Sequence, residues 1–364
     1  MKSIVRGISG VVVLAIAAFA PLAGQEMVYV AIQGEAKVSV VDAHTLEEVE
    51  RIDLTALGFS ENAKPHHIAV DPDGSHWYVS LIGENRILKF DRRNELVGEV
   101  EFQVPGLLVR APDTDRLYVG RSMSAVNPPR SIGEVDTRTM QVEEIDVFFP
   151  RPHALALAPT LGRIYSASLA QNQLASIDAK SFEMELLNLD GPVHTVVQFA
   201  VSPDGATLVG TTEMTGRLLI FDLADPAAPV LRASVPVGAR PWHPVFAPDG
   251  HTVWFAVKGD DAVVAVDVDR GEVVHRIEAA SLAAPHGAEI VDGRLFVTSN
   301  GPSGMQMGEM SMGGAAATES MHDAMGHGGK RPTTGTLTVI DLATLEVIGV
   351  LEMGENTTGI GARR

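Results

Sequence analysis

Short, mostly hydrophobic runs recur along this chain between polar segments, and seven of them end in aspartate. They are spaced 42 to 49 residues apart, except that the seventh follows the sixth after 74. Short apolar runs bounded by turn residues are consistent with buried β-strands, and a nearly constant spacing of this length indicates a repeated unit. The runs are VSVVD, ILKFD, IGEVD, LASID, LLIFD, VVAVD and LTVID, which end at Asp42, Asp91, Asp136, Asp178, Asp222, Asp267 and Asp341.

Each unit contains further strands around its aspartate run, such as TVWFAV before it and GEVVHRIEA after it. Four short strands in about 40 to 50 residues are typical of a propeller blade. The pattern therefore predicts an all-β fold, a single seven-bladed β-propeller over residues 25–364. The first unit, from about Met27, lacks an innermost strand. The C-terminal NTTGIGARR is predicted to supply it, so that pairing of the two ends of the chain closes the ring.

The repeats resemble the YVTN type of bacterial propeller repeat. The resemblance is carried by LFVTSN at 295–300 and by the PDG…YVS run at 72–80, and it extends over nearly all of residues 25–364. It implies the propeller fold and leaves the function open, because this fold carries unrelated activities.

The first 24 residues have the pattern of a signal peptide. Lys2 and Arg6 precede an apolar run from 11 to 20, and PLAG follows before Gln25. The apolar run is too short to span a bilayer, which takes about 20 residues. We therefore expect cleavage near Gly24 and a periplasmic or secreted protein with no membrane span after cleavage.

Composition excludes several function classes. The chain has no cysteine, so disulfides, thiolate metal sites and thiol catalysis are excluded. Its net charge of −18 argues against nucleic acid or anionic lipid as a partner. The G-x-S-x-G, Walker A and H-E-x-x-H motifs are absent, which removes the common hydrolase and nucleotide-binding signatures.

Half of the twelve histidines fall where innermost strands are expected to begin. The innermost strands of a propeller surround the central channel, so these side chains are predicted to converge at its mouth. His194 joins the set when its segment is aligned by the preceding proline, whereas alignment by the following turn puts Gln198 there instead. The six histidines are His66, His67, His153, His194, His243 and His286.

Several neutral imidazoles in one small volume suit copper or zinc, and imidazole also binds iron and nickel. The arrangement, a histidine pair on one blade and single histidines on later blades, is similar to the catalytic propeller of nitrous oxide reductase, which binds a multicopper cluster. The resemblance implies that all six histidines are ligands. This chain has Pro105 and Gly106 where that family has a histidine, and it lacks a cupredoxin domain, so the same reaction is not expected. Two alternatives are an organic or anionic ligand, and histidines that only cap turns.

A methionine-rich insertion at about 301–334 explains the long seventh spacing. Thioether sulfur selects Cu(I), and histidine extends the range to Cu(II), so the segment is interpreted as copper-capturing and is predicted to share the face of the histidines. The alternatives are a low-complexity loop and a sacrificial target for oxidants. Its candidate ligands are Met305, Met307, Met310, Met312, Met321, His322, Met325 and His327.

These observations predict an exported copper-binding propeller, either a redox enzyme or a copper store or carrier. Its expected partners are the metal ion and a periplasmic electron-transfer or copper-delivery protein. The alternative is a non-catalytic scaffold for a protein, cell-envelope or small-molecule partner, and a lactone hydrolase ranks third. We place Arg110, Arg151 and Arg240 near the channel mouth, and interpret aspartates such as Asp71 and Asp73 as turn formers.

Overall fold

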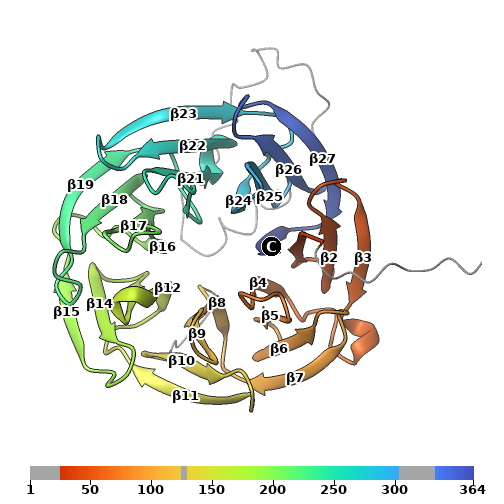
Figure 1. Ribbon diagram of the computed structural model, residues 1–364, viewed down its shortest axis with the longest axis horizontal. Coiled ribbons are helices and arrows are strands. Elements are labelled where there is room, and N and C mark those ends of the chain that lie inside the picture. The colour runs from red at the N-terminus through yellow and green to blue at the C-terminus, as the bar shows by residue number, and fades with distance from the viewer. Residues whose placement is uncertain (1–24, 124–128, 303–332) are drawn as a thin grey trace, which may run out of the picture.

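The computed structural model describes residues 25–123, 129–302 and 333–364, which form seven four-stranded antiparallel sheets. Figure 1 shows the sheets arranged radially, with strands such as β4, β8 and β12 nearest the axis and strands such as β7, β11 and β15 on the rim. The all-β, seven-bladed prediction is confirmed. No described helical segment is long or apolar enough to cross a bilayer.

We number the blades along the chain and give their strands from the axis outward. Blade 1 contains β28 (Thr357–Arg363), β1 (Met27–Ile32), β2 (Lys37–Asp42) and β3 (Glu48–Asp53). Blade 2 contains β4 (Pro65–Val70), β5 (His76–Leu81), β6 (Arg86–Asp91) and β7 (Leu96–Glu101). Blade 3 contains β8 (Pro105–Arg110), β9 (Arg116–Arg121), β10 (Ser131–Asp136) and β11 (Gln141–Asp146). Blade 4 contains β12 (Pro152–Ala158), β13 (Arg163–Ser168), β14 (Gln173–Asp178) and β15 (Met184–Asn188).

The remaining three blades follow the same plan. Blade 5 contains β16 (Val196–Val201), β17 (Thr207–Thr212), β18 (Arg217–Asp222) and β19 (Val230–Pro236). Blade 6 contains β20 (Val245–Phe246), β21 (Thr252–Val257), β22 (Ala262–Asp267) and β23 (Glu272–Glu278). Blade 7 contains β24 (Pro285–Val291), β25 (Arg294–Ser299), β26 (Gly335–Asp341) and β27 (Val347–Gly354). Short 3-10 turns lie at Thr55–Leu57, Pro159–Leu161 and Lys258–Asp260.

The repeated aspartate ends the third strand of each blade and closes the turn to the fourth. In blade 1, Asp42 Oδ1 accepts the backbone N–H groups of His44 and Thr45 at 2.9 and 2.8 Å. This bonding supports a tight turn, which is why the sequence repeats aspartate there. The apolar residues of the strands pack between neighbouring sheets. The packing between blades 1 and 2, for example, includes Tyr29, Trp77 and Phe90, all buried.

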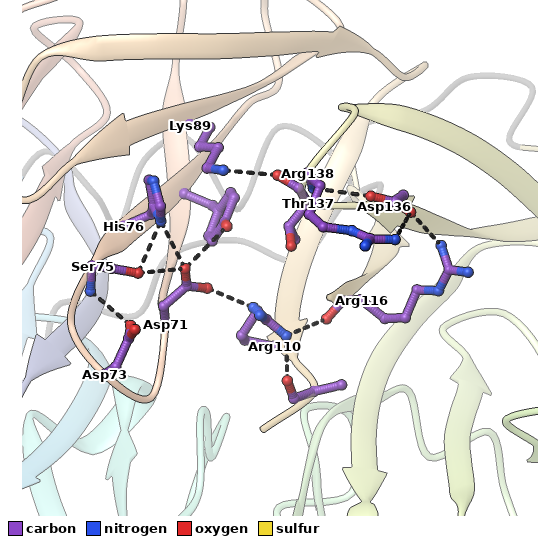
Figure 2. A network of polar contacts seen from close by, with 12 residues as sticks. Asp71, Asp73, Ser75, His76, Lys89, Arg110, Arg116, Asp136, Thr137 and Arg138 are labelled. Atoms are coloured by element: carbon purple, nitrogen blue, oxygen red, sulfur yellow. Dashed lines mark hydrogen bonds and ion pairs between the residues drawn. The ribbon is translucent and has the colours of Figure 1, made fainter. Parts of the chain in front are cut away.

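Asp71 does more than form a turn. It follows β4 on the face of the ring opposite to the strand starts, and it binds Arg110 of blade 3 through Arg110 Nε and Asp71 Oδ1 at 2.6 Å. Figure 2 shows this pair within a network that also includes His76 and Ser75. Arg110 ends β8 on this opposite face, so its expected place near the channel mouth was wrong.

We expect Arg110→Ala to lower the free energy of unfolding by about 3 kcal/mol, because it leaves the Asp71 carboxylate buried without its main partner. The two side chains are 11% and 8% exposed, so solvent screens the pair weakly. Arg138→Ala is the matched control, since that side chain is 71% exposed beside Asp136. The control is expected to change stability by less than about 0.5 kcal/mol in urea titrations. Equal effects of the two substitutions would contradict a structural role for the buried pair.

Candidate metal centre

In six blades the residue that begins the innermost strand pairs with the last residue of the second strand, as Pro65 does with Leu81 and Val196 with Thr212. In blade 6, where β20 begins later at Val245, Pro241 makes the equivalent pair with Val257 through an isolated bridge, and we treat Pro241 as the first strand residue there. The preceding residue has a positive φ and accepts a backbone hydrogen bond from the residue after the second strand. In blade 2, for example, Ile82 N donates to Lys64 O at 3.1 Å. The positive-φ residues are Lys64, Val104, Arg151, Thr195, Arg240, Ala284 and Asn356, with φ from 44° to 58°.

This register places the histidines in two adjacent rings of positions around the axis. The position after the first strand residue contains His66, Gly106, His153, Val197, Trp242, His286 and Thr358. The next position contains His67, Leu107, Ala154, Gln198, His243, Gly287 and Gly359. We call the side of the ring on which these strands begin the histidine face.

Five imidazoles from four blades lie together at this mouth of the channel. The ring centroids of His66 lie 6.5 Å from His153 and 6.0 Å from His286. Those of His243 lie 4.7 Å from His286 and 5.7 Å from His67. Residues up to 220 positions apart in the sequence are therefore neighbours in space. We call these five residues the histidine cluster.

His194 is not part of the histidine cluster. It lies before Thr195, the positive-φ residue of blade 5, and therefore two residues ahead of the strand start. Its Nε2 donates to Asp190 O and its Nδ1 accepts from Thr215 Oγ1, both at 3.0 Å. Both ring nitrogens are used within the blade, so grouping His194 with the other five was wrong. Gln198, which alignment by the following turn had indicated, occupies the equivalent position.

Hydrogen bonds assign the protons on three of the imidazoles. His153 Nδ1 lies 2.7 Å from Val197 O and His66 Nδ1 lies 3.0 Å from Gln33 Oε1. These oxygens only accept, so Nδ1 carries the proton and Nε2 has a free lone pair in both rings. His67 differs, because its Nδ1 accepts the N–H of Leu108 at 3.2 Å. Neutral His67 therefore carries its proton on Nε2.

Four buried ring nitrogens have no hydrogen-bond partner among the described residues. They are Nε2 of His66, His153 and His243, and Nδ1 of His286. A buried polar atom left without a partner costs about 1–3 kcal/mol, and native proteins contain few of them. Four such atoms from four blades at one place indicate that a ligand completes the site.

The imidazoles of the histidine cluster are neutral at physiological pH. Burial is the main cause, because it disfavours the imidazolium form, and the neighbouring imidazoles act in the same direction. The pKa of His67 and that of His153 are each lowered to about 4. The pKa values of His66, His243 and His286 are lowered well below the usual range. The lone pairs are therefore available without loss of a proton.

The histidine cluster is wider than a mononuclear metal site. No three of its ligand atoms lie within 4.8 Å of one another. Among the described residues, the one group of His, Asp or Glu side chains that meets this limit consists of Glu26, His44 and Asp292. There, His44 Nε2 lies 3.3 Å from Glu26, whereas its Nδ1 lies 4.0 Å from Asp292. The two carboxylates thus face different nitrogens of one exposed ring, which suits ion pairing better than chelation.

Cationic side chains surround the histidine cluster. Lys258 follows β21 on the histidine face, where its backbone N–H donates to Arg240 O, and its Nζ lies 4.9 Å from the ring centroid of Trp242. Arg151 and Arg240 lie at the mouth as expected, and Arg240 pairs with Glu213 at 3.2 Å. We did not predict a role for Lys258 or Gln33. Both residues directly follow the second strand of their unit, so an alignment of the units at that position would have identified them.

The candidate ligands in the methionine-rich segment lie outside the described residues, from Met305 to His327. The described residues that flank the segment are on the histidine face. Asn300 N donates to Ala284 O at 3.0 Å, directly before the first residue of β24, and Gly301 lies against Thr334. The flanking residues thus lie on the face that was predicted for the segment. The place of the segment itself stays a prediction.

Solved structures resemble this chain closely in fold and weakly in sequence. A functionally unknown protein from Desulfotomaculum acetoxidans is 15% identical, with a TM-score of 0.68 over 92% of this chain and 98% of that one. Apo AztD from Citrobacter koseri is 10% identical, with a TM-score of 0.63 over 93% and 98%. A streptogramin B lyase is 12% identical, with a TM-score of 0.63 over 82% and 87%.

No family model and no curated protein matches the chain. The resemblances to YVTN repeats and to nitrous oxide reductase therefore stay predictions. At identities of 10 to 15%, the solved structures show the fold alone. By its structure and by these comparisons, the chain is a seven-bladed β-propeller.

Proposed function

We propose that this protein is an exported copper-binding propeller that holds copper at the mouth of its channel. The observation that carries the proposal is a set of four buried imidazole nitrogens that have no hydrogen-bond partner in the described part of the chain, contributed by His66, His153, His243 and His286. Their neutral state is the form that binds a metal. Copper bound there would supply one-electron chemistry if the protein is a redox enzyme. If the protein is a copper store or carrier, the ion itself is the cargo. The signal-like residues 1–24 support export.

The hydrogen bonds of His66 and His153 support metal binding in particular. In both rings Nδ1–H donates to an oxygen, which fixes the tautomer and leaves Nε2 directed at the site. Histidine ligands of metals are usually held by such an outer hydrogen bond, which also makes the ligating nitrogen more basic. Gln33 Oε1 and Val197 O would therefore act as positioning groups for two of the ligands.

We assign a different role to His67. Its Nδ1 is occupied by the N–H of Leu108, so its Nε2 carries a proton in the neutral ring. In this tautomer the side chain donates a hydrogen bond rather than a lone pair. We propose that His67 contacts a molecule bound beside the copper ion and does not bind the ion itself.

The spacing of the histidine cluster requires movement on metal binding. Bonds of about 2.0–2.1 Å in a tetrahedral site place nitrogens about 3.3 Å apart. No three ligand atoms of the histidine cluster lie within 4.8 Å of one another. Binding of one ion by three or more imidazoles would therefore bring at least one pair of ligand atoms closer by about 1.5 Å or more through side-chain rotation. Binding of more than one copper ion would require less movement.

The choice of copper rests on the donor atoms. The chain offers imidazole and thioether ligands and no thiolate, and six of its thirteen methionines fall between residues 305 and 325. Soft thioether ligands select Cu(I). We propose that this segment captures copper and delivers it to the histidine cluster, because its described flanking residues are on the same face.

The test is the copper content of protein exported to a copper-supplemented periplasm, measured by mass spectrometry. The double variant His66→Asn/His153→Asn keeps a side-chain donor for Gln33 and Val197 but removes both Nε2 ligands. We expect stoichiometric copper in the wild type and a copper affinity at least about 100-fold lower in the double variant.

His194→Gln is the matched control, because glutamine can both donate and accept as this imidazole does, and it should retain copper. Deletion of residues 305–327 should slow copper loading without lowering the final copper content. A double variant that keeps its copper, or a wild type that never acquires any, would contradict the proposal.

A second candidate function is docking of a partner protein on the histidine face. Val193 and Met214 are 49% and 59% exposed, and they are adjacent, since Met214 N donates to His194 O at 3.2 Å. Exposed apolar side chains of this size often mark protein contacts. A copper-delivery protein or an electron-transfer protein would make use of such a contact, and so would a non-catalytic scaffold.

A further inference from the structure

The charges around the histidine cluster differ in sign from those of the whole chain. The chain has a net charge of −18. The leading electrostatic influences on the five imidazoles nevertheless come from Lys258, Arg151 and the imidazoles themselves, with no carboxylate among them. A positive region within so acidic a protein is a feature that the proposed metal binding does not explain.

Lys258 is the most unusual of these cations. It is buried, and within the described part of the chain its ammonium group has neither an ion pair nor a side-chain hydrogen bond. Its charge acts on His66, His243 and His286, and its Nζ lies over the ring of Trp242. Burial lowers the pKa of Lys258 to about 8, so the group is still mostly charged at neutral pH. A buried charge without a counterion is costly.

The nearby charged residues do not balance Lys258. Glu213, which follows β17 at the position equivalent to Lys258, is paired with Arg240 at 3.2 Å. Arg151 donates to Met123 O, and its Nε is buried without a partner. At the described positions that flank the strand starts, Lys64, Arg151, Arg240 and Lys258 are cationic and Glu213 is anionic. Asp261, whose Oδ1 accepts the N–H of Ala284 at 2.8 Å, reduces this excess of positive charge without cancelling it. A copper ion held by neutral imidazoles would increase this excess.

We propose that a small anion, an inorganic oxyanion or a short carboxylate, binds at the mouth of the channel between Lys258 and the histidine cluster. Lys258 supplies the opposite charge and His67 Nε2–H supplies a hydrogen bond. With copper present, the anion also occupies an open coordination position. The coordination of the anion to copper rests on the proposed function. The attraction between the anion and Lys258 does not, because the buried charge of Lys258 and its lack of an ion pair among the described residues are independent of the metal.

Azide is a suitable probe, because it is a small monovalent anion that produces a charge-transfer band when it binds Cu(II). Its affinity would be measured by calorimetry on the metal-free protein and by absorption on the copper-loaded protein. Lys258→Met keeps the unbranched stem over Trp242 but removes the charge, and we expect it to weaken azide binding at least about tenfold in both forms. Lys37→Met, at a partly exposed lysine paired with Glu35, is the control and should leave both affinities unchanged.

The two proposals fail separately in this design. Azide affinities of Lys258→Met within twofold of wild type, at equal copper content, would overturn the anion site and leave copper binding intact. A wild-type protein without copper would contradict the proposed function. Calorimetry on the metal-free protein would still decide the anion site, which is overturned if the wild type binds no azide or if Lys258→Met binds it equally well.

Discussion

Deletion of residues 357–364 should abolish the cooperative fold of this protein. These residues include β28, which pairs with β1 and so joins the two ends of the chain in blade 1. Without β28, the inner edge of β1 and the core around Ile360 become exposed. The free energy of unfolding of a typical domain is about 5–15 kcal/mol, and opening the ring is expected to remove most of it. Loss of a single sharp transition in thermal circular dichroism would verify this result.

A point substitution tests the same closure without shortening the chain. Gly359 lies against blade 2, and a Cβ at this position would come within 2.1 Å of the carbonyl oxygen of His66. Gly359→Val should therefore separate β28 from β4 and lower the midpoint of thermal unfolding strongly. Arg364→Ala is the control, because it removes the contacts of an exposed side chain with Glu289 and with Ile290 O but leaves the pairing of β28 intact, so the variant should keep a single sharp transition. An intact transition in both Gly359→Val and the deletion would show that the ring does not depend on this strand.

The fold could be predicted because each blade is specified locally. The aspartate that ends the third strand bonds to the backbone of its own turn, so the repeat is visible in the sequence whatever surrounds it. The closing strand could be predicted by counting, since the first unit was one strand short. The role of Asp71 could not, because its partner Arg110 comes from another blade, 39 residues away.

The histidine cluster was predictable only in part. Proline begins the innermost strand in blades 2, 3, 4 and 7, and in blade 6 Pro241 makes the equivalent pair ahead of β20. In blade 5 that position is Val196, and Pro192 lies four residues earlier. Alignment by proline therefore placed His194 wrongly. The positive-φ residue directly precedes the equivalent position in every blade. Its seven representatives share no side-chain chemistry, so the sequence gives no sign of it. Lys258 was missed for a related reason, since two of the three imidazoles on which its charge acts, His66 and His286, come from other blades.

The metal-free protein should lose stability steeply as the pH falls from about 6.5 to about 4. In the unfolded chain histidine has a pKa of about 6.5, whereas burial lowers the pKa of His153 to about 4. Below pH 6.5 the unfolded chain therefore binds protons that the folded protein does not, and folding becomes less favourable. For His153 alone the loss reaches about 3 kcal/mol at pH 4. His66, His243 and His286 shift in the same direction and add to the loss.

The substitution His153→Asn isolates one of these contributions. Asparagine can still donate to Val197 O, but it does not titrate, so the variant should lose about 2 kcal/mol less than the wild type between pH 7 and pH 5. Urea unfolding at the two pH values measures the difference. His251→Asn is the control for the substitution itself, because that imidazole is 63% exposed and lies outside the histidine cluster.

Copper binding to the folded protein should depend weakly on pH over the same range, in contrast to folding. Metal binding normally releases protons from histidine ligands below pH 6.5, but these imidazoles are already neutral. The dissociation constant for copper should therefore change less than about threefold between pH 7.5 and pH 5.5, as long as the protein stays folded. A tenfold or larger weakening would mean that copper binds exposed, ordinarily titrating histidines instead of the buried cluster.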